Sequence, residues 1–189
     1  MKTTIHVRNM CCQRCIDAVT DELHSLGLTT VSVKLGVANY MSSEKIKLSQ
    51  IESALSKRGF VLIKDEVEIL VEKIKAATFE LVHHLTEIEK TNFLFSSYLE
   101  EQVKVPYRVI SKIFSERKHL TIEKYFILLK VEKIKDMIEN SNVQFSEIAF
   151  LMGYKSLSHL SAQFKQVAGL TMNDYKKSGT KIRKLIDRI

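Results

Sequence analysis

The sequence FSEIAFLMGYKSLSHLSAQFK, at residues 145–165, decides the fold of the C-terminal part of this chain. Its first seven residues suit a short helix, a glycine-containing turn follows, and Ser156 is a preferred N-cap residue for a second helix. Four apolar residues in and just after this stretch recur at helical spacing. We expect these four to face a core: Leu157, Leu160, Phe164 and Val167.

Short helices also precede and follow this stretch. Phe95–Val103 suits one helix, and Pro106 takes a tolerated first-turn position in the next. Thr121 begins a long helix that runs to about Asn140, and the Thr171 segment has a capping-box pattern. The outward face of the helix after Ser156 carries small polar groups, an amide and a cation, which can hydrogen-bond DNA bases and phosphates.

Residues 91–178 resemble the C-terminal DNA-binding domain of the AraC/XylS transcription regulators. The resemblance is carried by Ser146-Glu147-Ile148-Ala149, Gly153-Tyr154, Phe164-Lys165, Gly169-Leu170-Thr171 and Tyr175. It implies two helix-turn-helix units joined by a rigid helix at Ile122–Glu139, with the first unit at Phe95–Lys118, and binding to double-stranded DNA. The implied DNA-binding residues are Arg108, Ser111 and Lys112 in the first unit, and Leu157, Ser158, Ser161, Ala162, Gln163 and Lys165 in the second.

Two positions depart from the family pattern. His119 stands where relatives often have glycine after the first recognition helix, and histidine tolerates that backbone better than most residues. Ala162 stands where relatives often have arginine, so we expect less direct base readout from the second unit. Phosphate contacts from Lys155, Lys165 and Lys176 would still position that unit.

The N-terminal segment, residues 1–65, predicts strands and helices in the order βαββαβ. Alternating residues predict strands at 4–7, 29–35, 37–41 and 60–63, and helical spacing predicts helices at 16–26 and 49–57. This order in about 65 residues is typical of a ferredoxin-like fold. The whole chain is therefore expected to be α+β, with a C-terminal all-α double helix-turn-helix domain.

All three cysteines of the chain lie within residues 11–15, between the first strand and the first helix. In a reducing cytosol, a close cysteine group more often binds metal or does redox chemistry than forms a structural disulfide. The sequence from Met10 to Cys15 resembles the Met-x-Cys-x-x-Cys loop of heavy-metal-associated (HMA) domains. The resemblance implies that Cys12 and Cys15 are metal ligands and that Met10 anchors the loop.

The metal suggested by two thiolates is a soft heavy-metal ion, with Cu(I) favoured. Asn9 replaces the glycine usual before the Met, and Cys11 replaces a residue that is often threonine. A third sulfur could complete a three-thiolate site and admit Zn(II), Cd(II) or Hg(II), or it could point away from the other two. A thioredoxin-like redox pair is disfavoured, because such a pair has a cis-proline beside its thiols. The single proline of this chain, Pro106, lies outside the N-terminal domain.

Residues 66–90 predict one long helix. Apolar residues at spacings of four and three suit either a dimer seam or a connecting helix packed on its neighbours. The positions concerned are Val67, Val71, Ile74, Thr78, Leu81, Leu85 and Ile88. A basic tail at 179–189 completes the predicted organisation.

Composition and charge limit the function classes. The net charge is +7, and residues 91–189 carry 17 Lys/Arg against 10 Asp/Glu, which suits contact with phosphates. The chain has no membrane-spanning run or signal peptide, so we expect a cytoplasmic protein without membrane contact.

The leading hypothesis is a non-enzymatic regulator that binds DNA and senses a metal ion through its N-terminal cysteines. RNA polymerase and a second copy of the chain, held through 66–90 or the HMA-like domain, are possible further partners. The alternatives are an N-terminal domain that serves dimerisation or thiol-redox sensing without metal, a metal chaperone with a helical tail, and a thiol oxidoreductase.

Overall fold

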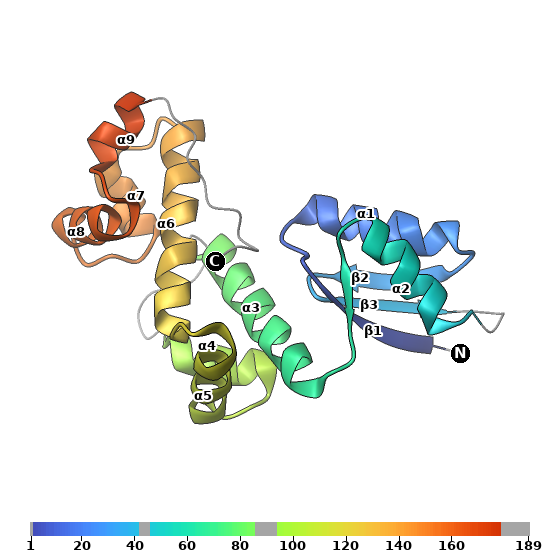
Figure 1. Cartoon of the computed structure of the whole chain (residues 1–189). Coiled ribbons are helices and arrows are strands. Elements are labelled where there is room, and N and C mark those ends of the chain that lie inside the picture. The colour runs from blue at the N-terminus through green and yellow to red at the C-terminus, as the bar shows by residue number, and fades with distance from the viewer. Residues whose placement is uncertain (1, 42–45, 86–93, 179–189) are drawn as a thin grey trace. The chain divides into compact units, whose positions relative to one another are not determined.

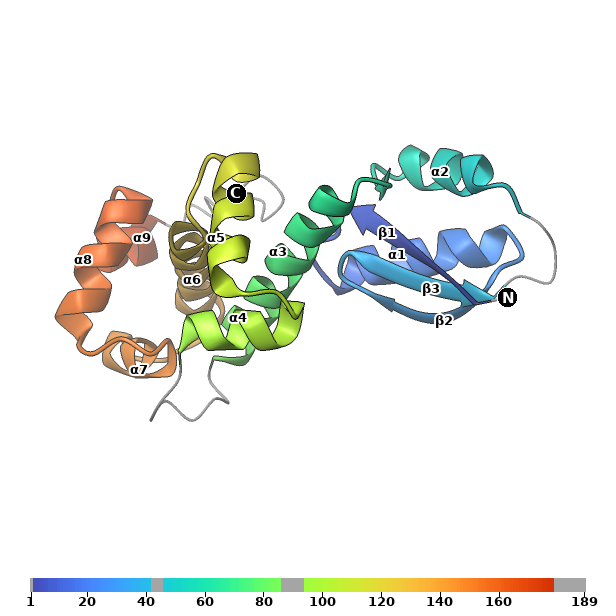
Figure 2. The same cartoon turned by 90° about the horizontal axis from the view of Figure 1, so that it is seen from below.

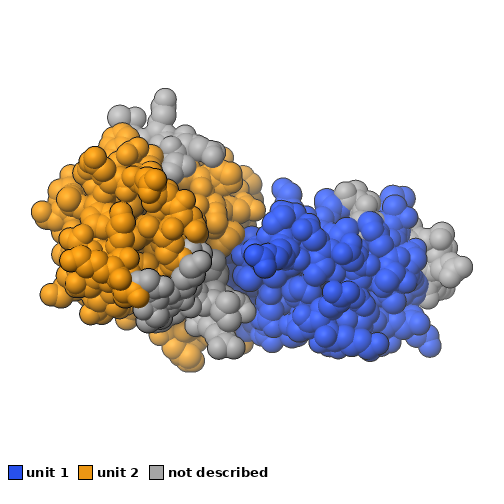
Figure 3. Space-filling view, turned by 90° about the horizontal axis from the view of Figure 1, so that it is seen from above, with its two compact units in different colours: residues 1–76 blue, residues 77–189 orange. Residues whose placement is uncertain are grey.

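A computed structural model of the chain describes residues 2–41, 46–85 and 94–178 (Figure 1). The chain divides into two compact units, residues 1–76 and 77–189, which Figure 3 shows in different colours. The division falls inside helix α3 (Glu66–His84), so one continuous helix contributes to both units. The predicted basic tail, residues 86–90 of the predicted linker helix and residues 91–93 of the predicted DNA-binding segment lie outside the described residues.

The N-terminal unit has the predicted βαββαβ order. Its four strands form one antiparallel sheet in the order β2-β3-β1-β4, with Ile5 opposite Ala38 and Val7 opposite Leu62. Helices α1 and α2 pack together beside this sheet (Figure 2). The elements are β1 (Lys2–Arg8), α1 (Gln13–Ser25), β2 (Thr29–Lys34), β3 (Val37–Met41), α2 (Leu48–Lys57) and β4 (Val61–Ile63). The ferredoxin-like expectation is therefore confirmed.

The core of this unit follows from the alternation in β1. Ile5 and Val7 are buried, because residues two apart on a strand lie on the same face of the sheet. They pack in one cluster with residues from α1 and α2, including Val19, Leu23 and Leu55. The sheet and helices thus hold the ends of β1 and α1 at fixed positions around the cysteine loop.

Helix α1 begins earlier than its apolar periodicity predicts. The predicted start was Ile16, whereas the helix starts at Gln13. Cys12 is the N-cap residue, and its carbonyl oxygen accepts a hydrogen bond from the Cys15 N–H at 3.0 Å. The first turn is polar and reactive rather than apolar, so hydrophobic spacing does not report it.

The C-terminal unit contains six described helices besides the end of α3. They are α4 (Phe95–Val103), α5 (Tyr107–Lys118), α6 (Ile122–Asn140), α7 (Phe145–Leu151), α8 (Leu157–Ala168) and α9 (Met172–Ser178). Figure 1 shows α4 and α5 at one end of α6 and α7 to α9 at the other. The predicted arrangement of two helix pairs on a joining helix is confirmed.

The predicted seam of α3 is largely buried within a single copy of the chain. Val71, Ile74, Thr78 and Leu81 are each at most 1% exposed, and Leu85 is 7% exposed. Residues that are already covered by their own chain favour the connecting-helix interpretation over the dimer seam. Ile88, the last predicted seam position, lies outside the described residues. None of the helices described is long and apolar enough to cross a membrane.

Candidate functional site

The cysteine loop joins β1 to α1 through a residue with a left-handed backbone. Asn9 has φ 73°, and its side-chain amide donates a hydrogen bond to the Gly59 carbonyl at 2.9 Å. Asparagine is among the few non-glycine residues that adopt this conformation readily. The expectation that Asn9 can replace the usual glycine is confirmed, and its bond to the α2–β4 turn helps to fix the loop.

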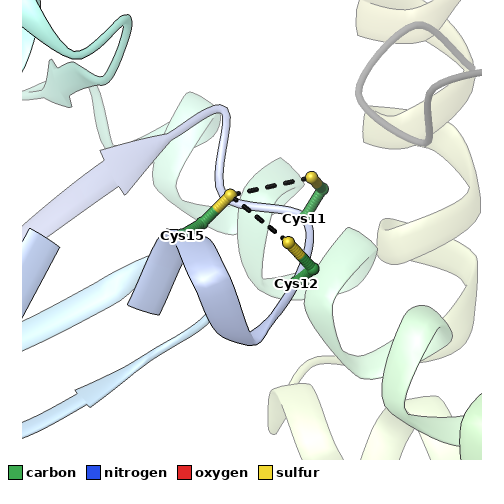
Figure 4. A group of neighbouring side chains, drawn as sticks. All are labelled: Cys11, Cys12 and Cys15. Atoms are coloured by element: carbon green, nitrogen blue, oxygen red, sulfur yellow. Dashed lines mark hydrogen bonds between the residues drawn. The ribbon is translucent and has the colours of Figure 1, made fainter. Parts of the chain in front are cut away.

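The loop brings all three sulfurs together (Figure 4). The Sγ atoms of Cys11 and Cys12 each lie 3.7 Å from the Sγ of Cys15, and the three sulfurs lie within 4.8 Å of one another. All three side chains are partly exposed free thiols. Two thiolates bound to one Zn(II) at ~2.3 Å with tetrahedral angles are about 3.8 Å apart, so this donor set fits a thiophilic ion.

Met10 packs partly buried against the hydrophobic core of the N-terminal unit. Cys15 and Ala18 touch the same core from α1. These contacts anchor both ends of the loop, as the resemblance implied for Met10. The sulfurs of Cys11 and Cys12 can therefore move less than those of an unsupported surface loop.

The pKa values of the Cys11 and Cys12 thiols shift in opposite directions. Burial alone would raise the pKa of the Cys12 thiol, but hydrogen bonds from the Cys15 and Arg14 backbone N–H groups and from the neighbouring thiols lower it. Burial, followed by the bonds to Cys15 and Cys12, raises the pKa of Cys11 to about 12. Donors at a helix N-terminus favour a thiolate. Of these two residues, Cys12 therefore forms a thiolate more readily.

The first helix-turn-helix unit consists of α4 and α5. Ile110 and Phe114 are fully buried, while Arg108 and Lys112 are exposed and Ser111 is half-buried. Lys112 approaches Glu116 at 4.0 Å, a pair so exposed that it constrains the lysine little. Two of the three residues of α5 predicted to contact DNA, Arg108 and Lys112, are therefore cations exposed to solvent.

The apolar residues of α5 predict a core face that includes Val109 together with Ile110 and Phe114, but Val109 is 36% exposed. The buried side of α5 is set by Ile110 and Phe114, four residues apart, and Val109 lies beside that stripe.

The second unit consists of α7 and α8. The Ser156 hydroxyl accepts a hydrogen bond from the His159 N–H at 3.1 Å, which confirms the predicted cap. Leu160 and Phe164 are buried as expected, but Leu157 is 41% exposed rather than inward. It is the first residue of α8, so no preceding turn of the helix covers it. Leu157 is therefore exposed together with three residues predicted to contact DNA: Ser158, Ala162 and Lys165.

Gln163 has a partner that the sequence did not reveal. Its side-chain oxygen accepts a hydrogen bond from the Tyr154 hydroxyl at 2.7 Å, and the side chain is half-buried, as is Ser161. Lys130 of α6 lies 3.9 Å above the Tyr154 ring. Gln163 thus helps to hold the turn between α7 and α8 against α6.

A hollow of about 430 Å³ lies along the outward side of α8. Leu157, Ala162 and Lys165 line it from α8, and Phe145, Thr171 and Asn173 line it from the neighbouring elements. The last three were not predicted as site residues. The capping pattern at Thr171 located the start of α9 along the chain, but no sequence signal placed that start beside α8.

The comparisons with known proteins agree with this arrangement. Residues 99–178 match a family model described as a helix-turn-helix domain. No curated protein matches the chain.

Several solved structures are similar to part of the chain. The xylose-binding transcription activator XylR is 19% identical, with a TM-score of 0.47, over 63% of this chain and 28% of that one. The DNA-binding domain of AdpA, solved with a target DNA, is 16% identical, with a TM-score of 0.47, over 56% and 91%. An AraC-type regulator from Chromobacterium violaceum is 14% identical, with a TM-score of 0.44, over 55% and 95%. The chain thus spans less than a third of XylR.

Residues 99–178, in the C-terminal part of the chain, therefore contain a helix-turn-helix domain.

Proposed function

We propose that this chain is an AraC/XylS-type, sequence-specific DNA-binding transcription regulator that responds to a soft heavy-metal ion bound by its N-terminal cysteines, with Cys12 and Cys15 as ligands. The observation that carries the proposal is the grouping of three sulfurs within 4.8 Å at the start of α1. Soft thiolates select ions such as Cu(I), the first candidate, or Zn(II), Cd(II) and Hg(II). A chain that carries both such a group and a DNA-binding domain has the two parts that a sensor requires.

On the DNA side, α5 and α8 are the proposed recognition helices. Held at opposite ends of α6, they would enter successive major grooves about 34 Å apart. Arg108, Ser111 and Lys112 would act from α5. From α8 the proposed contacts are Leu157, Ser158, Ser161, Ala162, Gln163 and Lys165. The net charge of +7 supports phosphate contact, which predicts an affinity that falls steeply with added salt.

Metal binding would change DNA affinity through linkage. The ion must bind one arrangement of the protein more tightly than another, and DNA must also distinguish those arrangements. Helix α3 is the continuous element between the cysteine-bearing unit and the DNA-binding unit. It is therefore the segment through which we expect the change to pass.

The test uses DNA selected by the full-length protein from a random library. We expect Cu(I), Zn(II), Cd(II) or Hg(II) to change the Kd for that DNA about 5–150-fold under anaerobic conditions, the usual range of allosteric coupling. The Cys12→Ser/Cys15→Ser variant should bind the same DNA but lose the metal response. Gln13→Ala, an exposed change at the first residue of α1, directly after Cys12, is the matched control. A response that survives removal of both cysteines contradicts the proposal.

A thiol-redox sensor is the second candidate, favoured by the 3.7 Å separation of the Cys12 and Cys15 sulfurs. Loss of two electrons and two protons to an added oxidant such as diamide would join them in a disulfide. A regulator of this kind would change its DNA affinity with diamide and recover with dithiothreitol, without any metal. Equal DNA binding before and after diamide excludes it.

A further inference from the structure

We propose that Cys11, Cys12 and Cys15 act together as one three-thiolate site that prefers a thiophilic divalent ion of the zinc group, such as Cd(II). The inference rests on the proposed metal-sensing function and specifies its ligand set and metal class. It gives Cys11, which could have pointed away, the role of third ligand. A two-thiolate site would instead favour Cu(I) and leave Cys11 without a function.

The backbone makes the position of Cys11 informative. Cys12 has φ −164° and ψ 176°, an extended conformation in which consecutive side chains normally point to opposite sides. The sulfurs of Cys11 and Cys12 nevertheless lie at the same distance, 3.7 Å, from the sulfur of Cys15. Figure 4 shows the Cys15 sulfur linked to each of the other two. The first turn of α1 therefore brings Cys15 to the one place where both neighbours can meet it.

The size of the sulfur triangle fits an ion. Two of its sides are 3.7 Å and the third is at most 4.8 Å, which places a point equidistant from all three sulfurs at most about 2.4 Å from each. The Zn–S bond is ~2.3 Å long, and Cd–S bonds are somewhat longer. An ion in or just above this plane would reach all three sulfurs with little movement of the loop.

Charge also favours a divalent ion. Binding follows M²⁺ + 3 R–SH → M(SR)₃⁻ + 3 H⁺, so three thiolates around a divalent ion carry a net charge of −1. The same three thiolates around Cu(I) would carry −2 in a partly buried site. The N-terminal end of α1 offsets a single negative charge well, and backbone N–H groups of Arg14 and Cys15 already donate toward Cys12.

The site is also accessible. All three cysteines are partly exposed, so an ion can enter, and a fourth position remains for water or a small thiol. An open position suits an ion that must bind and leave as its concentration changes. It distinguishes this group from a closed structural site with four protein ligands.

The experiment compares the full-length wild type with Cys11→Ser and Cys11→Ala, purified anaerobically and titrated with CdCl₂ and, separately, with Cu(I) against a competing chelator. We expect both substitutions to lower Cd(II) affinity at least about tenfold. Loss of a residue that only hydrogen-bonds a metal ligand can already lower affinity about tenfold, so loss of a ligand should cost at least as much. The sulfur-to-cadmium charge-transfer band should fall to about two-thirds of its wild-type intensity. Cu(I) affinity should change less than about threefold, because two thiolates suffice for it.

Gln13→Ala is the matched control, since it changes an exposed side chain at the start of α1, between Cys12 and Cys15, without removing a sulfur. Circular dichroism and DNA binding without metal should be alike in all variants, which separates ligand loss from misfolding. Unchanged Cd(II) affinity and band intensity in Cys11→Ser would overturn the three-thiolate site while leaving a two-thiolate sensor intact. Wild-type protein that binds Cu(I) but not Cd(II) would overturn it as well. Failure of the wild type to bind either ion would instead refute the proposed function itself.

Discussion

The two helix-turn-helix units are supported by similar contacts but carry different outward faces. In the first unit Phe114 packs against Tyr125, with ring centroids 5.2 Å apart, and in the second Phe164 packs against Tyr175 at 5.8 Å. Both phenylalanines are fully buried. The similarity of these aromatic pairs shows that the scaffold of a recognition helix can be maintained independently of the residues it presents.

The outward faces differ mainly in charge and size. Of the residues proposed to contact DNA, the first recognition helix contributes two exposed cations, Arg108 and Lys112. The second exposes Ser158 and Ala162, with one cation at Lys165 and an open hollow beside them. Large cationic side chains give strong bidentate contacts to guanine, whereas small ones give single hydrogen bonds or contacts with thymine methyl groups. The two units are therefore expected to contribute unequally to sequence recognition.

The most direct test of this unequal contribution is to truncate one residue on the outward face of each recognition helix. We predict that Arg108→Ala or Lys112→Ala weakens specific DNA binding by about 1–3 kcal/mol, because each removes a side chain that we propose to contact a base. Ser158→Ala should cost less than about 1 kcal/mol, the value of one neutral hydrogen bond. The measurement is the Kd of each full-length variant for selected DNA, repeated at several salt concentrations.

Lys57→Ala is the control for charge alone, since it removes an exposed cation from α2 in the other unit. It should leave the preference between selected and random DNA unchanged. If Ser158→Ala costs as much as Arg108→Ala, the two units read DNA equally and the proposed asymmetry is wrong.

The C-terminal ends of α5 and α8 can be compared in the same way, with smaller expected effects. Both recognition helices end in a left-handed residue, His119 with φ 52° after α5 and Gly169 with φ 79° after α8. No heavy atom lies within 4 Å of a Cβ built on Gly169, so only backbone strain opposes a side chain there. We predict that Gly169→Ala destabilises the protein by about 1 kcal/mol and that His119→Gly stabilises it by about 0.5–1 kcal/mol.

Urea unfolding of the full-length variants measures both values. Both substitutions test the strain of a non-glycine residue at positive φ. Gly169→Ala adds this strain and His119→Gly removes it, so their effects on the free energy of unfolding should have opposite signs. A destabilising His119→Gly would mean that the histidine side chain makes a contribution that exceeds its backbone strain, and the two helix ends would then not be equivalent.

Local patterns predicted much of this molecule because they act over a few residues. The alternation that buries Ile5 and Val7, the caps at Thr121 and Ser156 and the positive φ at Asn9 and His119 all depend on near neighbours. These features are enough to define the order of elements and hence the sheet. The grouping of the three cysteines is local in the same sense, since all three lie within a window of five residues, 11–15.

What could not be predicted depends on contacts between distant segments. Phe145, Thr171 and Asn173 line the hollow beside α8 only because α9 returns to that helix. Gln163 is held by Tyr154 because a turn brings the two together. The predictions that Val109 and Leu157 are buried were wrong for a different reason. Apolar spacing indicates which face of a helix is buried but not where that face ends.

The smallest expected effect concerns how each unit is tied to α6. The Tyr107 hydroxyl, at the start of α5, donates a hydrogen bond to Glu123, and the Tyr175 hydroxyl of α9 donates one to Glu139. Burial would raise the pKa of Glu123, but the hydrogen bond from Tyr107 and further donors lower it overall. A carboxyl with a lowered pKa in the folded state stabilises the fold above its unfolded pKa, about 4.3, and loses that contribution as the pH falls.

We therefore predict that Tyr107→Phe costs about 0.5–1 kcal/mol at neutral pH, because one partly exposed hydrogen bond is lost. The difference from the wild type should shrink as the pH falls through and below the unfolded pKa of glutamate, since Glu123 then becomes protonated in both proteins. Urea unfolding across that pH range measures it. In a Glu123→Gln background the same tyrosine change should show no such pH dependence. A cost that stays constant with pH would mean that the Tyr107 hydroxyl stabilises the fold independently of the charge on Glu123.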